Sequence, residues 1–246
     1  MRLAIVSVAT LLAICFLSQL PAWKLFDLRL FDYISTFRHQ SPADGGPVVV
    51  AIDEPSLSDI NMQWPWPRSL HAKLIEGLRA AGAKAIGLDI IFAEPSTEEN
   101  DAALARALGP DVVLAADETL IQSPQADQLI RTEPLKRFTD TGAHSGIASI
   151  TLERDGIFRS MPFYSDGFAA QLAQAAGLGH KPADDRLIQW LGPARTYPTV
   201  SYYQALEPQT MLPPGFFKDR IVLVGLSLQN AADLNDKVSD AFATSY

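Results

Sequence analysis

Acidic side chains follow three apolar segments of the chain, each at the point where the segment ends. The six residues are Asp53, Glu54, Asp89, Glu94, Asp117 and Glu118. If the segments are neighbouring parallel strands, their carboxyl ends form one rim, which is where open α/β sheets bind ligands. Carboxylates converging there could hold Mg²⁺, Ca²⁺ or a cationic small molecule, because hard cations prefer oxygen ligands. The alternative is that these acids cap the following helices or accept hydrogen bonds from loop amides.

A loop with two tryptophans, Trp64-Pro65-Trp66-Pro67-Arg68, precedes a predicted helix. The prolines keep the segment extended, and the indole rings offer large rigid surfaces that could stack on a ligand. Arg68 could bind a carboxylate in a bidentate manner. The alternative is a loop that folds back over the core of its own domain, with Arg68 paired to Asp53 or Asp89. The candidate ligand-binding residues are therefore Asp53, Glu54, Trp64, Trp66, Arg68, Asp89 and Glu94.

Other reactive side chains do not match a known catalytic or metal-binding pattern. The histidines are His39, His71, His144 and His180, and the only cysteine is Cys15. Their spacing fits neither a metal site nor an internal disulfide. A hydrolytic set can be drawn from His71, Asp53 and nearby serines, but no G-x-S-x-G element supports it. No P-loop or dinucleotide fingerprint is present either. We predict no catalytic residue, no metal and no cofactor.

The overall charge argues against nucleic acid as a partner. The chain of 246 residues has a formal net charge of −8. Its calculated isoelectric point is about 4.9. Binding a polyphosphate needs a basic surface that displaces counterions, and no Lys/Arg cluster provides one.

An almost uncharged apolar run occupies residues 3–20. A helix of about 20 apolar residues is long enough to cross a membrane. We predict a transmembrane signal anchor at residues 1–22. The alternatives are a cleaved signal peptide, to which Gln19-Leu20-Pro21-Ala22-Trp23 is a poor match, and a buried helix of a soluble domain.

Residues 23–40 are predicted to form a juxtamembrane helix with one apolar and one polar side. Such an apolar side must pack against something, and a second copy of the same helix is one partner. We therefore expect a homodimer, with Leu25, Leu28 and Phe31 as the positions at which a crosslink would test the pairing.

Residues 41–246 alternate between strand-like and helix-like segments. Strands are predicted at residues 48–52, 84–92, 111–116, 187–191 and 220–224, with two extended pieces within 142–164 around an Asp-Gly turn. Helices are predicted at residues 69–81, 97–108, 168–176 and 200–206. Strand–helix–strand repeats with short connections imply parallel pairing. The predicted fold is α/β, a mixed, mostly parallel sheet with flanking helices, preceded by one N-terminal transmembrane helix.

Three stretches resemble the N-terminal half of the CHASE2 domain: PVVVAIDE at residues 47–54, WPWPRSLH at 64–71 and AAGAKAIGLDIIFAEP at 80–95. Arg154-Asp155-Gly156 with Arg159 and Pro162 resembles the central hairpin of that family, and IVLVG at residues 221–225 resembles its later strand. The resemblance covers residues 31 to about 235, and residues 230–246 match only loosely. The Trp-Pro-Trp-Pro-Arg element is its most specific part.

The resemblance implies an extracytoplasmic sensory module of bacterial adenylate or guanylate cyclases, diguanylate cyclases or kinases. It further implies an N-terminal anchor in the inner membrane, additional membrane helices and a cytoplasmic effector, so we expect the chain to be the sensor part only, without an enzymatic activity of its own. Its ligand would be an unknown small molecule. The alternatives are a periplasmic hydrolase-like enzyme that uses the acidic rim with a divalent cation, and a purely structural interaction domain.

Overall fold

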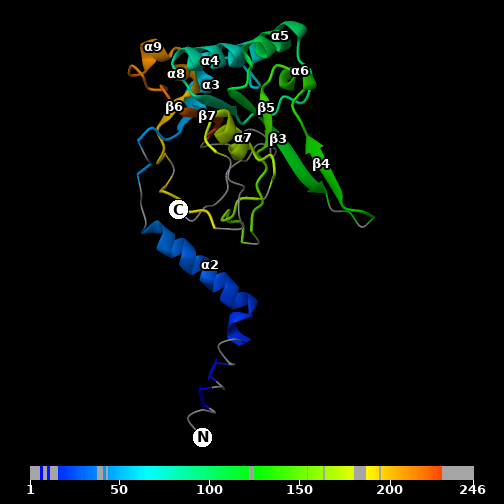
Figure 1. Cartoon of the computed structure of the whole chain (residues 1–246), viewed down its shortest axis with the longest axis vertical. Helices are drawn as coiled ribbons and strands as arrows, with labels where there is room; N and C mark the ends of the chain where they lie inside the picture. Colours follow the sequence, from blue (N-terminus) through cyan, green and yellow to red (C-terminus); the bar gives the residue numbers. More distant parts are fainter. Residues whose placement is uncertain are drawn as a thin grey trace.

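The structure is a computed structural model that describes residues 6–7, 10–11, 16–37, 41–42, 44–121, 123, 125–153, 155–162, 164–179, 187–193 and 195–228. These residues form a seven-stranded sheet flanked by helices (Figure 1). The strands are β1 (Val48–Ile52), β2 (Ala85–Leu88), β3 (Val112–Ile121), β4 (Gln128–Thr132), β5 (His144–Ile147), β6 (Thr199–Ser201) and β7 (Ile221–Leu226). The helices are α2 (Pro21–Thr36), α3 (Glu54–Ile60), α4 (Arg68–Ala80), α5 (Glu98–Ala107), α6 (Lys136–Thr139), α7 (Phe168–Ala175), α8 (Tyr202–Ala205) and α9 (Pro208–Met211).

The sheet is mixed and mostly parallel, as the sequence predicts. The strand order is β4-β3-β2-β7-β1-β6, and β5 pairs with β3. The pairings between these strands are parallel except that of β3 with β4. β7 lies between β1 and β2 and pairs with both. Both strands are therefore interior to the sheet, which fits their unbroken apolar sequences.

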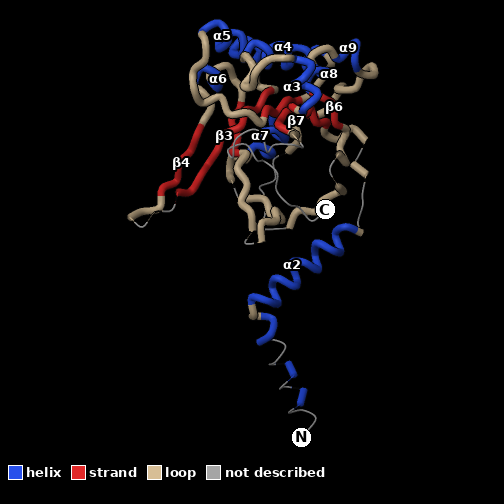
Figure 2. Tube along the Cα trace, turned by 180° about the vertical axis from the view of Figure 1, so that it is seen from behind, coloured by secondary structure: helices blue, strands red, loops and turns tan. Residues whose placement is uncertain are grey.

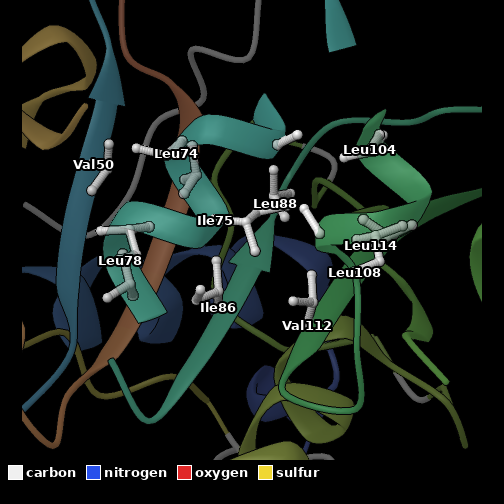
Figure 3. Packing of buried hydrophobic residues seen from close by; sticks show 14 of the residues in the cluster. Val50, Leu74, Ile75, Leu78, Ile86, Leu88, Leu104, Leu108, Val112 and Leu114 are labelled. Atoms are coloured by element: carbon white, nitrogen blue, oxygen red, sulfur yellow. The ribbon is translucent and has the colours of Figure 1, made fainter. Parts of the chain in front are cut away.

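One face of the sheet, beneath α4 and α5, carries the main hydrophobic core (Figure 3). Leu74, Ile75 and Leu78 of α4 are 0% exposed. They belong to the same cluster as Ile86 of β2 and Leu114 of β3. Each side chain of this kind contributes about 1.5–3 kcal/mol when it is fully buried. The helical spacing of apolar residues at 69–81 thus identifies the face of α4 that enters the core.

The opposite face is covered by α7, which approaches the strands very closely. Phe168 and Leu172 of α7 are buried in a second, smaller cluster. A Cβ atom added to Gly146 of β5 would lie 2.6 Å from the Cα atom of Phe168, and one added to Gly87 of β2 would lie 2.8 Å from its ring. These two glycines allow the close approach. Over β7 this face is less completely covered, and Leu223 is only half-buried.

Most of the predicted elements are confirmed. The helices predicted at residues 69–81, 97–108 and 168–176 correspond to α4, α5 and α7. The strands predicted at 48–52, 84–92, 111–116 and 220–224 correspond to β1, β2, β3 and β7, although β2 already ends at Leu88. Local start signals account for part of this agreement. Thr97 caps α5, for example, because its hydroxyl accepts a hydrogen bond from the Asn100 N–H at 3.4 Å.

Three predicted elements differ from the structure. Residues 187–191 form no strand, and only Leu187 makes an isolated bridge, to Ser160. The extended pieces predicted within 142–164 are irregular beyond β5, although Gly156 does turn the chain by donating its N–H to the Glu153 carbonyl at 2.9 Å. The helix predicted at 200–206 starts at Tyr202, because the preceding serine ends β6 and caps α8. The sequence did not predict α3, α6, α9, β4 or β6.

The helix predicted for residues 23–40 corresponds to α2, which ends at Thr36, while residues 38–40 lie outside the described residues. α2 lies at the underside of the molecule, away from α3, α4 and α5 (Figures 1 and 2). Residues 1–5, 8–9 and 12–15 of the predicted anchor lie outside the described residues, as do Arg154 and residues 229–246. Within the part of the chain that is described, no helix combines the length and the hydropathy required to cross a membrane.

Candidate functional site

Asp53 and Asp89, two of the predicted acids at strand ends, follow strands that are not neighbours in the sheet. Asp53 follows β1 and Asp89 follows β2, and β7 lies between these strands. Asp53 is 7% exposed and accepts hydrogen bonds from the hydroxyls of Ser56 and Ser201, each at 2.6 Å. It also caps α3 through the Ser56 backbone N–H at 3.0 Å. Glu54 is the half-buried first residue of α3. Asp53 thus caps a helix, as in the alternative to a ligand rim, and its carboxylate connects α3 to β6.

Asp117 and Glu118 do not end a strand, because β3 continues to Ile121 and pairs there with β4. The Ser149 hydroxyl donates to the Asp117 carboxylate at 2.6 Å and accepts from the Glu118 backbone N–H at 2.7 Å. Within the described ranges, no three His, Cys, Asp or Glu side chains are grouped so that they could hold a metal ion. The predicted acids thus lie in separate places.

The tryptophan loop (residues 64–68) folds onto the core. Trp66 is 3% exposed, and its Nε1 donates a hydrogen bond to the Met62 carbonyl at 3.2 Å. Its ring lies 4.8 Å from that of Tyr202, measured between centroids, and Trp64 packs edge-on against it at 5.3 Å. These contacts agree with the alternative in which the loop covers the core.

Arg68 pairs with Asp101 of α5, so the expected pairing with an acid at the end of β1 or β2 is wrong. Its guanidinium donates to the Asp101 carboxylate and to the Glu94 carbonyl oxygen. It also lies 5.4 Å and 5.3 Å from the ring centroids of Phe92 and Phe138. Asp101 is the acid within reach because α4 and α5 pack side by side. Glu94 contributes through its backbone, and its side chain is exposed.

A buried histidine–tyrosine pair lies next to the tryptophan loop. His71 Nδ1 is 2.9 Å from the Tyr202 hydroxyl oxygen, and the two residues are 1% and 0% exposed. Burial, with a smaller effect from the Arg68 charge, lowers the pKa of His71 to about 4. The ring is therefore neutral at pH 7. A cavity of about 630 Å³ is lined by His71 and by four of the predicted ligand-binding residues, Trp64, Trp66, Arg68 and Glu94.

A second cavity, here called the sheet-face cavity, lies on the α7 side of the sheet and also measures about 630 Å³. Of the predicted ligand-binding residues, only Asp89 lines it. Its other polar lining side chains include Ser149 and Tyr164, and burial raises the pKa of Tyr164. Its apolar lining comes from sheet, helix and loop, and includes Val49, Ile147, Ile150, Met161, Phe168, Ala173 and Leu223.

A buried arginine connects α2 to the rest of the domain. Arg159 is 0% exposed, and its guanidinium bonds to Asp32 of α2 at 2.6 and 2.8 Å. It also donates to Glu153 at 2.8 Å and to Asp155 at 2.8 and 3.0 Å. We call these four residues the Arg159 clasp. The bonds to Asp32 first, then to Asp155, raise the pKa of Arg159, and the Arg159 guanidinium lowers the pKa of Asp155.

The Arg159 clasp was not found from the sequence, because Asp32 and Arg159 are 127 positions apart. One usable signal exists. Asp32 lies on the same side of α2 as Leu28 and Ser35, at helical spacing, so a carboxylate on that side requires a partner within the domain.

The sheet-face cavity and the Arg159 clasp share one stretch of chain, residues 150–162. Ile150, Met161 and Pro162 line the cavity at the two ends of this stretch. The clasp residues Glu153, Asp155 and Arg159 lie between them in sequence. We call it the linking segment. Residues that line the cavity and residues that hold α2 therefore belong to one short stretch of the chain.

Comparison with known proteins gives one family. The family model described as the CHASE2 domain matches residues 8–246. That range contains α2, the whole sheet and the three stretches on which the resemblance rests. No curated protein and no solved structure matches the chain.

Proposed function

Because the chain belongs to the CHASE2 family, an extracellular sensory domain family of signalling proteins, we propose that it is the extracytoplasmic sensor region of a bacterial membrane-bound signal-transduction protein. Its signal passes to a cytoplasmic output domain of the cyclase, diguanylate cyclase or kinase type. The apolar run at residues 3–20 is the membrane anchor in this proposal, and the sheet domain is the part that meets the stimulus.

The linking segment is the observation that carries this proposal. A molecule that enters the sheet-face cavity contacts Ile150 and Met161, at the ends of the segment that carries Arg159. A shift of Arg159 changes its bonds to Asp32, and Asp32 lies on the helix that follows the anchor. Signalling needs an element with two arrangements whose balance a ligand can shift. Here that element is α2, held to or released from the linking segment.

The lining of the sheet-face cavity favours a small molecule that is largely apolar. Most of its lining side chains are apolar, and Asp89, Ser149 and Tyr164 supply a few polar groups. This combination is typical of small-molecule sites, in which apolar contacts provide affinity and a few polar groups fix the orientation. The cavity beside the tryptophan loop is less suitable, because the Arg68 guanidinium on its wall is already bonded to Asp101 and Glu94.

The hydrolase alternative receives less support from the geometry. It requires carboxylates that share a divalent cation at the ends of β1 and β2. Asp53 is instead bonded to two serine hydroxyls, and Asp89 lies beyond β7 on the cavity side. We therefore place the functional site at the cavity and the Arg159 clasp.

The location is tested by labelling cells that express the chain. In a Cys15→Ser background, a single cysteine replaces Leu129, which is 63% exposed on β4. A membrane-impermeant maleimide should label it in intact cells as fully as in lysed cells. Labelling only after lysis would place the domain in the cytoplasm and overturn the proposal.

The signalling role is tested in the full-length protein in its own membrane, with the activity of its output domain as the measurement. Asp32→Asn should change the basal output at least threefold, because it weakens the bond between α2 and Arg159. Asp27→Asn, the same substitution at an exposed position of the same helix, should leave the output unchanged. Equal outputs from the two variants would show that the Arg159 clasp does not carry the signal.

A further inference from the structure

α2 presents a stripe of large apolar side chains that nothing in the described part of the chain covers. Its members and their exposed fractions are Trp23 (43%), Phe26 (56%), Leu30 (42%), Tyr33 (63%) and the C-cap residue Phe37 (69%). Leu25 (39%) and Ile34 (52%) are exposed beside it. Two pairs of rings contact each other, with centroids 5.9 Å apart for Trp23 and Phe26 and 4.9 Å apart for Tyr33 and Phe37. We call these five residues the α2 stripe.

The spacing within the α2 stripe is that of a coiled-coil seam. Its residues follow one another at intervals of three, four, three and four, which are the a and d positions of two successive heptads and the a position of the next. In the same register, Leu28 and Ser35 fall at f positions, directly opposite the seam. Ser35 is 8% exposed and Leu28 is half-buried, so this side of α2 faces the domain. Asp32, which binds Arg159, lies beside them at a c position.

We propose that the α2 stripe is the interface with α2 of a second copy of this chain. At about 200 Å² for each large side chain, the exposed fractions leave roughly 500 Å² per copy to be buried. A pair then buries roughly 1,000 Å², which is the lower bound for a specific interface between proteins. The Arg159 clasp lies on the other side of the helix, so α2 can bind its copy and its own domain at once.

The shape of the stripe favours a copy of α2 over membrane lipid. A helix surrounded by lipid is apolar on all sides, whereas α2 carries Lys24, Asp27 and Arg29 at exposed positions. The exposed stripe differs from the dimer positions that were expected from the sequence. Of the positions expected from the sequence, Leu28 and Phe31 are half-buried, and Leu25 lies at a c position outside the stripe.

The pairing is tested by disulfide crosslinking of the full chain in membranes, in a Cys15→Ser background. Phe26→Cys, Leu30→Cys and Tyr33→Cys place a thiol on the stripe. Lys24→Cys and Leu25→Cys are the matched controls, since both positions are exposed on the same helix but lie outside the stripe. Side chains at a and d positions meet their counterparts across a coiled coil within disulfide distance.

The seam variants should give at least fivefold more crosslinked dimer than the two controls. Equal crosslinking at all five positions, or none at the seam, would overturn the pairing. Reaction of the seam positions with a photoactivatable lipid, without crosslinked dimer, would overturn it in favour of a membrane contact. The result is independent of the maleimide test of location, so failure of one proposal can be told from failure of the other.

Discussion

The two faces of the sheet are built in different ways. The face under α4 and α5 is closed by aliphatic side chains such as Leu74, Ile86 and Leu114, each 0% exposed (Figure 3). The opposite face has one described helix, α7, seated on glycines, together with the sheet-face cavity and an ion cluster that holds α2. The difference teaches that the contacts that stabilise the fold and the contacts proposed to carry the signal involve different residues. One face can hold the fold while contacts on the other change.

The physical reason lies in the kind of contact. Separating buried aliphatic groups destabilises the fold strongly, because both the apolar burial and the dispersion contacts are lost. An ion cluster close to water can exchange its partners for water at a smaller net cost. The Arg159 clasp has this character, since its three carboxylates are 17–24% exposed even though the guanidinium is 0% exposed.

Leu74→Ala should lower the stability of the fold more than any other substitution considered below. A smaller effect would contradict the view that the face under α4 and α5 stabilises the fold. Leu74 is 0% exposed in the main core, and removal of such a side chain costs about 2–5 kcal/mol through lost burial and the cavity that is left. The measurement is the free energy of unfolding in urea. Leu129→Ala on β4, where the residue is 63% exposed, is the control and should change it by less than about 0.5 kcal/mol.

Lowering the pH should reduce the free energy of unfolding through protonation of His71, a buried residue of α4. Burial lowers the pKa of His71 from 6.5 in the unfolded chain to about 4 in the fold. The neutral ring is favoured in the fold, so its contribution is complete above pH 6.5 and is lost as the pH falls towards 4. The loss should reach about 3 kcal/mol.

The test compares unfolding free energies at pH 7 and pH 4.5 for the parent chain and for His71→Gln. Gln can still accept a hydrogen bond from the Tyr202 hydroxyl and does not titrate. The pH dependence should become shallower in the variant. An unchanged slope would mean that other groups, such as carboxylates, control the acid response.

Gly146→Ala should destabilise the seat of α7 by about 1–3 kcal/mol, because the new methyl group would lie 2.6 Å from the Phe168 backbone and overpack the contact. Gly179→Ala is the control, since nothing lies within 4 Å of its added Cβ and it should be neutral within about 0.5 kcal/mol. Thermal unfolding of both variants gives the measurement. If Gly146→Ala left the stability unchanged, α7 would be able to move away from β5, and the close contact between them would not be required for stability.

The sequence predicted one face far better than the other. The main core follows from apolar periodicity, since the helical pattern of α4 and the unbroken strands β1 and β2 are local signals that burial on both sides explains. The insertion of β7 between β1 and β2 could not be predicted, because strand order depends on contacts between residues far apart in the chain.

The candidate site was predicted only in parts, for the same reason. Asp89 does line a cavity, whereas Asp53 was expected in a ligand rim and instead bonds to Ser56 and Ser201. An acid at a strand end can either bind a ligand or accept structural hydrogen bonds. Which of these it does depends on whether a donor from another strand, such as Ser201, comes within reach. The Arg159 clasp depends on a pairing across 127 positions, which no local pattern encodes.

The smallest effect on global stability should come from the Arg159 clasp itself. In Asp32→Asn the guanidinium keeps its bonds to Glu153 and Asp155, and only the attachment of α2 is weakened. We expect the free energy of unfolding of the sheet domain to fall by about 1 kcal/mol or less, because the buried guanidinium stays paired with two carboxylates.

Amide exchange separates the two faces within this one variant. Exchange across α2 should accelerate at least fivefold in Asp32→Asn and stay unchanged in β1 and α4, because local opening does not require the core to separate. Asp27→Asn, exposed on the same helix, should show neither change. If α4 exchanged faster in step with α2, the clasp and the core would form one cooperative unit. The division between a stabilising face and a signalling face would then be wrong.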